Sequence, residues 1–346
     1  MTIQSTLAPG SINFVWQPHR NYAYIQEQLF GLIEACLPPK SVVHTVGDAV
    51  EGTVSLSLFI RQSREEVAAT PADIIMAHGV ADKRYFFIIG NDGLPLANKY
   101  KYVFVPGTWH VNRLVEGRFR SDPKNQITLQ DSQIKKVGWL RLDPMINLVS
   151  NSPATKHSRL RVLWAPTHNT ISSNNPDSKM SPSSYPGFRK HILTMFLAYK
   201  FTISLHPRNR GTKTPTVDKL VASDVIISDF GTMVFEAWSL GKPVIFPRWC
   251  IDVETLINRN PLSAESHIYR NKIGLHPETP WQMHKMLRKI NRARKKDPGR
   301  DQRGANVAHF IDTYIDPSAR GNDAMHTAET LIEIAREQGL NVHRRS

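Results

Sequence analysis

Residues 224–246 read DVIISDFGTMVFEAWSLGKPVIF, and this stretch decides the fold. It begins with an apolar run, 224–227, that has the composition of a buried strand. The small polar segment that follows predicts the start of a helix, which we expect to end at Gly241 with Pro243 just beyond. A second β-rich run then covers 243–246. Strand, polar turn, helix, glycine stop and strand together are typical of a parallel α/β sheet.

The start of this predicted helix is a candidate anion site. A helix N-terminus presents unpaired backbone N–H groups and the positive end of the helix dipole, which favour phosphate. Asp229 is either part of such a site or a simple N-cap of the helix. Glu236 lies one turn further in, on a face able to reach a ribose.

Strand-like and helix-like segments alternate along the rest of the chain, which indicates parallel sheets. A polar segment near residue 150 reads as a linker between two such sets. We therefore predict two α/β, Rossmann-like domains over 1–150 and 151–332, followed by a basic C-terminal tail at 333–346. Ligands of such domains bind outside the carboxyl ends of the strands.

The chain has 346 residues, a net charge of +14 and a pI near 9.8. Such an excess of positive charge indicates an anionic partner or surface. Nine Lys/Arg and two Asp give residues 281–303 a net charge of +7, half of the total, over an apolar stripe at helical spacing. One interpretation is an amphipathic helix on anionic lipid or polymer, using Lys285, Lys289, Arg292 and Lys296. The other is a surface helix packed on the core with a solvated basic face.

Several kinds of site find no support in the sequence. The chain lacks Asp-x-Asp, Gly-x-Gly-x-x-Gly, Gly-x-x-x-x-Gly-Lys-Ser/Thr and Gly-x-Ser-x-Gly motifs, so we expect neither a metal ion nor a resident cofactor. Cys36 and Cys250 form no metal-spaced pair and no disulfide framework, which favours a reducing cytoplasm. Residues 1–16 do not read as a signal peptide, and no apolar run suits a membrane span. Any membrane contact is therefore expected to be peripheral, at the inner face of the cell membrane.

His78 is a candidate general base. It follows a short apolar run at 74–76 that reads as a buried strand, so we expect it at a carboxyl strand end. An exposed imidazole there can take a proton from an attacking hydroxyl at neutral pH. The alternative is a histidine that is hydrogen-bonded within a loop.

Five segments in chain order resemble motifs of the CDP-glycerol glycerophosphotransferase family, the teichoic acid and capsule polymerases of the GT-B superfamily. They are MAHGVADK at 76–83, VGWLRLD at 137–143, LWAPT at 163–167, SLHPR at 204–208 and the segment 228–246. The resemblance spans roughly residues 74–332. It implies a GT-B fold, in which two Rossmann-like domains face each other across a cleft.

The resemblance also implies roles for single residues. His78 would be the general base, and His206 a second functional histidine that stabilises the leaving phosphate. The donor nucleotide and its phosphates would be held by the C-terminal domain through Thr167, Arg208, Ser228, Asp229, Gly231, Thr232 and Glu236. Gly231 stands where the family often has Ser, and Glu236 where it often has Asp. Because of these departures the donor stays open between CDP-glycerol and a nucleotide sugar.

The sequence thus predicts a metal-independent transferase that uses a nucleotide-activated donor and an anionic polymer of the cell envelope as acceptor. An anionic membrane surface is a further expected partner. Two enzymatic alternatives use the same fold: a glycosyltransferase acting on a DNA base hydroxyl, with 281–303 following the phosphates, and a nucleotide-sugar epimerase. A non-catalytic nucleotide or polyanion binder is the third alternative.

Overall fold

The chain divides into two structural units, which we treat one at a time. Unit 1 comprises Met1–Asp143 and Asp312–Ser346, and unit 2 comprises Pro144–Ile311. The structure is a computed structural model. It describes residues 7–17, 23–59, 72–81, 84–87, 89–90, 93–151, 158–167, 183–206, 216–297 and 301–340.

Unit 1 is built on a six-stranded parallel sheet in the order β2-β1-β3-β4-β5-β6. Its strands are β1 Ile12–Trp16, β2 Val42–Val46, β3 Val54–Ser57, β4 Ile74–Met76, β5 Tyr102–Val105 and β6 Ile134–Lys136. The central strands β3 and β4 are buried along their whole length, as expected when helices cover both faces of a parallel sheet.

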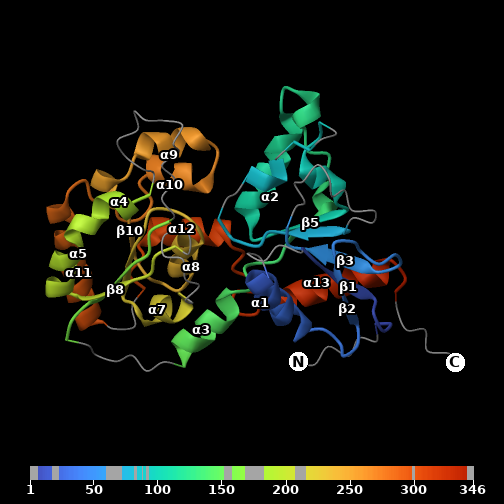
Figure 1. Cartoon of the computed structure of the whole chain (residues 1–346), viewed down its shortest axis with the longest axis horizontal. Helices are drawn as coiled ribbons and strands as arrows, with labels where there is room; N and C mark the ends of the chain where they lie inside the picture. The colour runs from blue at the N-terminus through green and yellow to red at the C-terminus, as the bar shows by residue number, and fades with distance from the viewer. Residues whose placement is uncertain are drawn as a thin grey trace. The chain divides into compact units, whose positions relative to one another are not determined.

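The helices of unit 1 come from both ends of the chain. They are α1 Ala23–Glu34, α2 Thr108–Glu116 and α13 Asp323–Glu337, with short 3-10 turns η1 Arg84–Phe87, η2 Leu96–Lys99, η3 Gly117–Phe119, η4 Pro123–Asn125 and η5 Asp131–Gln133. In Figure 1 α13 runs beside α1 against the sheet, and it contacts both α1 and β3.

Unit 2 is built on a four-stranded parallel sheet in the order β10-β9-β7-β8. Its strands are β7 Arg161–Trp164, β8 Lys200–Ile203, β9 Val225–Ile227 and β10 Val244–Ile245. Its helices are α4 Tyr185–Phe188, α5 Ile192–Ala198, α7 Val217–Ala222, α8 Thr232–Ser239, α9 Val253–Arg259, α10 Ala264–Arg270 and α11 Pro280–Lys296, with 3-10 turns η6 Arg189–His191 and η7 Arg248–Cys250. Two further helices, α3 Leu142–Ser150 and α12 Ala305–Tyr314, contain the points at which the chain passes between the units.

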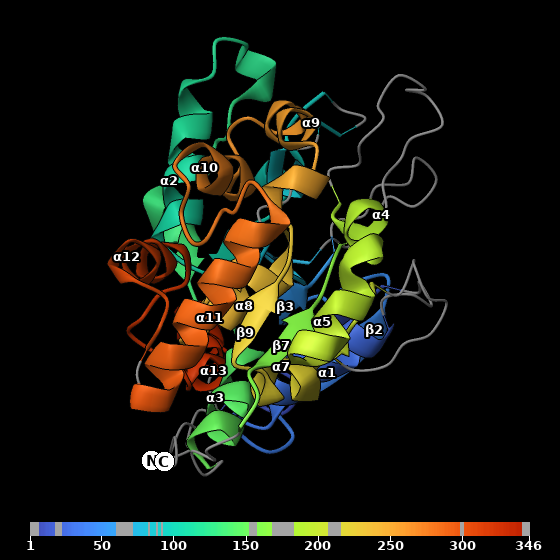
Figure 2. The same ribbon diagram turned by 90° about the vertical axis from the view of Figure 1, so that its left-hand side faces the viewer.

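One face of the unit 2 sheet packs on a hydrophobic core. Val162 and Trp164 of β7 join this core with Met195 of α5 and with Met283 and Leu287 of α11. Successive side chains of a strand point to opposite faces, so every second residue of β7 serves this layer. Figure 2 shows α5 and α11 on the same side of β7 and β9.

The stretch that decided the fold forms as predicted. Residues 225–227 are β9, α8 follows and ends at Ser239, and β10 covers Val244–Ile245. Gly241 has a φ of +74°, a left-handed conformation that glycine adopts without strain at the end of a helix.

The chain divides differently from the predicted boundaries 1–150, 151–332 and 333–346, because its C-terminal part returns to unit 1. The Asp143 carboxylate accepts hydrogen bonds from the backbone N–H groups of Asp323 (3.0 Å) and Ala324 (2.8 Å), the first residues of α13. A Cβ atom at Gly138 would lie 1.9 Å from Asp323 Oδ1, so only glycine fits there. The segment VGWLRLD thus holds the start of α13, which continues into the predicted tail as far as Glu337.

This contact generates a prediction about pH. Burial and the neighbouring Asp143 carboxylate raise the pKa of Asp323 from 3.8 to about 8. A raised pKa means that the folded state holds the proton more tightly, so its contribution to stability is complete below about pH 4 and is lost as the pH rises through about 8. Each pH unit between the two pKa values is worth about 1.4 kcal/mol, so Asp323→Asn, which is neutral throughout, should gain about 4 kcal/mol in free energy of unfolding over the wild type between about pH 5 and about pH 9.

Urea denaturation of both proteins across this range measures the effect. Asp131→Asn, at an exposed position of the same unit, is the matched control and should follow the wild type. Parallel pH profiles for Asp323→Asn and wild type would show that the pKa of this carboxyl is the same in the folded and unfolded states.

Candidate functional site

Three neighbouring strands of unit 2 end at one edge of the sheet and bring the predicted donor residues together. β7 lies between β8 and β9, and the strand order reverses at β7 and β9. Such a reversal is where open α/β sheets bind ligands. β7 leads into Thr167, β9 into Ser228 and Asp229, and β8 into His206.

The Asp229 carboxylate organises this edge. Its Oδ1 accepts hydrogen bonds from the backbone N–H groups of Thr167 (2.8 Å) and Phe230 (2.9 Å). Its Oδ2 accepts from the N–H (2.6 Å) and the hydroxyl (2.9 Å) of Ser184. The side chain has no solvent exposure, and burial raises its pKa while these hydrogen bonds oppose the rise. Asp229 is not the N-cap of α8, as one interpretation predicted, because the N-cap is Gly231 and no side chain caps the helix. The carboxylate instead joins three loop segments as a structural acceptor.

Ser228 has a similar structural use. Its hydroxyl donates to the backbone carbonyl of Ala165 at 2.7 Å, and the residue is fully buried. Ser228 therefore ties the loop after β7 to the loop after β9. Its predicted contact with phosphate through the hydroxyl would require this bond to break.

Gly231 opens α8 in a conformation that only glycine adopts readily. Its φ is +98° and its ψ is −178°. A Cβ atom there would meet nothing within 4 Å, so the requirement for glycine comes from the backbone and not from crowding. The turn sets the first N–H groups of α8, beginning with Thr232, at the carboxyl edge of the sheet, where the helix dipole is positive. Both residues are half-buried.

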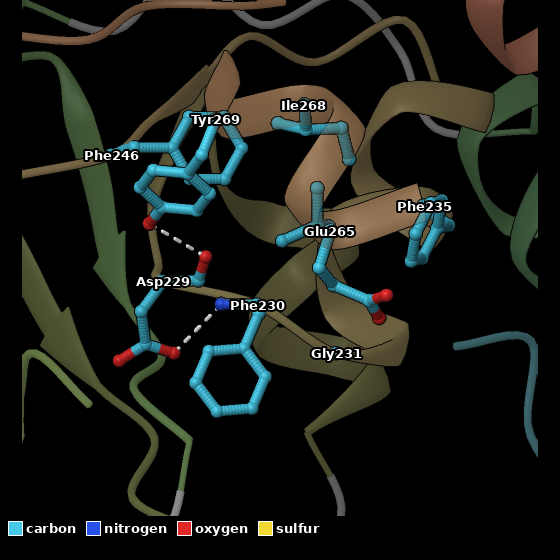
Figure 3. A pocket seen from close by; sticks show the side chains of 9 residues that line it. Asp229, Phe230, Gly231, Phe235, Phe246, Glu265, Ile268 and Tyr269 are labelled. Atoms are coloured by element: carbon cyan, nitrogen blue, oxygen red, sulfur yellow. Dashed lines mark hydrogen bonds between the residues drawn. The ribbon is translucent and has the colours of Figure 1, made fainter. Parts of the chain in front are cut away.

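A small pocket lies beside this turn (Figure 3). The Tyr269 hydroxyl of α10 donates to the backbone carbonyl of Asp229 at 2.8 Å and closes one side. Phe230, Gly231 and Glu265 line other parts of the wall. The side chains leave no room inside it even for a water molecule, so the pocket as it stands holds no part of a nucleotide.

Glu236, His206 and Arg208 complete the predicted donor set. Glu236 lies within α8 and is 1% exposed. His206 is half-buried beyond the end of β8, after Ser204, whose hydroxyl is 2.8 Å from that of Thr216. Arg208 lies outside the described residues. The roles of these three residues stay predictions.

His78 lies at the carboxyl edge of the unit 1 sheet, just after β4. Its ring stacks on Phe59, which follows the neighbouring strand β3, with centroids 4.0 Å apart and planes 23° from parallel. The Tyr314 hydroxyl donates to the backbone carbonyl of Val80 at 2.6 Å and fixes the turn after His78. The imidazole is thus positioned by a ring and a pinned loop, and it stays half-buried.

The basic segment 281–303 is mainly the helix α11, and its two sides differ as the second interpretation predicts. Met283, Leu287 and Ile290 are buried in the core of unit 2. The predicted surface residues are all exposed: Lys285, Lys289, Arg292 and Lys296. The apolar stripe therefore serves the fold, while the basic face remains open to solvent.

Sequence reasoning missed the residues that support these sites. Ser184, Tyr269, Phe59 and Tyr314 all act through contacts between segments far apart in the chain. None belongs to a motif or has a distinctive spacing, so the sequence held no signal for them. Within the described ranges, no three His, Cys, Asp or Glu side chains are grouped so as to hold a metal ion.

The Asp229 network generates a prediction about stability. In Asp229→Asn the amide group would direct N–H donors at a site where backbone N–H groups already donate. Since hydrogen bonds to a buried charged group contribute roughly 1.5–3 kcal/mol each, we expect a loss of about 3 kcal/mol or more. Thermal unfolding measures it, with exposed Asp218→Asn of α7 as the control. Equal melting temperatures for the two variants would contradict the assigned role.

Solved structures of the wall teichoic acid polymerase TagF share this fold. One has a TM-score of 0.59 at 11% identity, covering 96% of this chain and 90% of that chain. A histidine variant of TagF soaked with CDPG gives 0.59 at 13% identity, with coverages of 96% and 90%. UDP-GlcNAc 2-epimerase from Neisseria meningitidis bound to UDP-GlcNAc is more distant, with 0.44 at 14% identity and coverages of 93% and 99%.

No protein-family model matches the chain, and no curated protein matches it in sequence. Two parallel α/β units and the likeness to TagF confirm the predicted GT-B fold. They support, at the level of the fold, the resemblance drawn from the five motifs.

Proposed function

We propose that this chain is a GT-B transferase, which moves a glycerophosphate or glycosyl group from a nucleotide-activated donor to a hydroxyl of an anionic acceptor such as a cell-envelope polymer. The observation that carries the proposal is the edge of unit 2, where the ends of β7, β8 and β9 meet the start of α8. That edge combines backbone N–H groups with the positive end of a helix.

On the donor side, α8 and its Gly231 turn provide the phosphate site. Backbone N–H groups that are held rigid stabilise negative charge without reorganising during the reaction. The Asp229 network supplies that rigidity, because it fixes the loops on both sides of the turn. Arg208 and His206 are the predicted partners of the leaving phosphate, and Glu236 that of the ribose. No metal ion has a role in this proposal.

On the acceptor side, His78 removes the proton. The acceptor O–H bond breaks, its proton goes to an imidazole nitrogen, and the oxygen forms a bond to the transferred group. The atom attacked in that group is the β-phosphorus of CDP-glycerol or the anomeric carbon of a nucleotide sugar. The bond from this atom to the leaving oxygen breaks, and the nucleotide departs with the electron pair.

The solved structures of similar fold suggest which donor to test first. TagF is a wall teichoic acid polymerase, and a variant of it was soaked with CDPG, which favours CDP-glycerol as the first donor to test. Nucleotide release assayed over a panel of CDP- and UDP-activated donors tests the proposal. Release that needs a DNA acceptor would favour the nucleic acid alternative, and isomerised donor without any acceptor would favour the epimerase.

The proposed general base His78 generates a prediction about the reaction rate. His78→Ala should lower the rate of nucleotide release by about 10²–10⁴-fold, because a positioned general base contributes that much. Affinity for the nucleotide, measured by calorimetry, should stay within a few fold. His326→Ala, at a half-buried position of α13 where the ring is hydrogen-bonded to the Lys136 carbonyl, is the matched control. A fully active His78→Ala enzyme would remove the histidine from the mechanism.

The glycine turn at Gly231 generates a prediction about nucleotide affinity. Gly231→Ala places a side chain in a strained conformation, and the turn should relax and move the N–H groups of α8. We expect nucleotide affinity to fall about tenfold or more, the equivalent of losing one charge-assisted contact. Gly241→Ala imposes a similar strain at the other end of the same helix and should leave affinity unchanged. Equal affinities of the two variants would place the phosphate elsewhere.

A further inference from the structure

The apolar stripe of α11 is not available to a lipid surface, because Met283, Leu287 and Ile290 lie in the protein core. The exposed side of α11 is basic, except for Ala293 and for Trp281, which is 65% exposed. Nowhere in the described part of the chain is a helix long and apolar enough to cross a membrane. An apolar contact with lipid would have to come from another element.

The neighbouring helix α5 provides exposed apolar side chains. Leu193 is 72% exposed, Leu197 76% and Phe196 47%. Within this helix the buried residue is Met195. A surface helix of a globular protein usually turns polar side chains to water, so a leucine pair and a phenylalanine on one short helix need an explanation.

α5 lies against α11. The Tyr199 hydroxyl, directly after α5, is 3.0 Å from Nδ1 of His284 of α11, and the two rings stack at 5.7 Å. Burial and the nearby positive charges of Lys190 and His284 lower the pKa of His191, directly before α5. Figure 2 shows both helices on the same side of the unit 2 sheet. Their exposed faces therefore belong to one surface.

This surface has positive charge around its apolar residues. Neither α11 nor the segment 183–203 contains an Asp or Glu. Lys190 and Lys200 are exposed at the two ends of α5, and Lys285 lies over the Trp281 ring at 5.4 Å. We call the whole surface the α5–α11 patch and define it by Leu193, Phe196, Leu197, Trp281, Lys285 and Arg288.

The Arg159 guanidinium fixes the shape of the patch. It donates to the carbonyl oxygens of Phe196 (3.0 Å), Leu197 (2.8 Å) and Tyr199 (3.0 Å) at the end of α5. A cation at a helix C-terminus stabilises the helix through its dipole. The exposed leucines are therefore carried by an anchored element.

We propose that the α5–α11 patch docks this protein on an anionic lipid bilayer. A soluble polyanion would contact the basic side chains alone. A lipid interface contacts both the apolar and the basic side chains, because the apolar ones enter the acyl boundary while Lys and Arg face the acidic headgroups. Trp281 suits the headgroup level, where amphipathic rings gather. The inference concerns where the protein is held, and it does not depend on which donor it uses.

Co-sedimentation of the full chain with vesicles tests the proposal. The wild type should bind vesicles of phosphatidylcholine mixed with phosphatidylglycerol and not vesicles of phosphatidylcholine alone. Leu193→Ser with Leu197→Ser should weaken binding about tenfold, from lost apolar burial. Lys285→Glu with Arg288→Glu should weaken it by about tenfold or more, most clearly at low salt. Leu262→Ser, 62% exposed on the connection between α9 and α10, is the matched control and should bind like the wild type.

Three outcomes would overturn the proposal. One is wild-type binding that does not depend on phosphatidylglycerol. Another is unchanged vesicle binding by the leucine variant together with tight binding of inorganic polyphosphate, which would assign the patch to a soluble polyanion. The third is a dimer in sedimentation velocity that the leucine variant converts to monomer, which would assign it to a second copy of the chain. Circular dichroism of each variant shows whether it is folded, and its nucleotide affinity shows whether the donor site is intact. A variant that passes both tests has lost only its contact with the vesicle.

Discussion

The rest of unit 2 depends on one buried carboxylate. Removing an ion from water costs several kcal/mol, so Asp229 is stable there only because backbone N–H groups and a serine hydroxyl surround it. Those donors come from segments that are far apart in the chain, and each must be in place before the charge is compensated. The carboxylate therefore fixes the loops after β7 and β9 and, through them, the glycine turn that opens α8. The need to satisfy a buried charge thus makes this turn, the predicted phosphate site, rigid.

Unit 1 uses the same physical device for a different purpose. Asp143 accepts from the first backbone N–H groups of α13, where a helix dipole favours negative charge. This contact holds the C-terminal helix in unit 1. Burial and the nearby Asp143 charge raise the pKa of the second carboxyl, Asp323. Burial also raises the pKa of Asp143, but hydrogen bonds from Asp323 oppose that rise. Stability at this join is thus coupled to pH, whereas Asp229 is surrounded by neutral donors.

Local patterns predicted the fold well. The run 224–246 contains its own strand, glycine turn, helix stop and second strand, and these depend on neighbours in sequence. Long-range contacts were not predictable in this way. That Asp143 would cap α13, or that Ser184 would donate to Asp229, depends on which loops meet once two sheets have formed. The predicted hydroxyl of Ser228 illustrates the limit, because its type suits phosphate while its position commits it to Ala165.

The basic segment shows why amphipathic patterns are ambiguous in sequence. An apolar stripe beside a row of lysines has the same period whether it faces lipid or a protein core. In α11 the core takes the stripe, since Met283 and Leu287 fill the layer over β7 and β9. The exposed charge of α11 lies beside α5, whose leucines face water. The sequence spacing of these leucines alone does not predict that they are exposed. Charge and apolarity on this face come from two helices that are about 80 residues apart in sequence, so only their packing brings the two properties together.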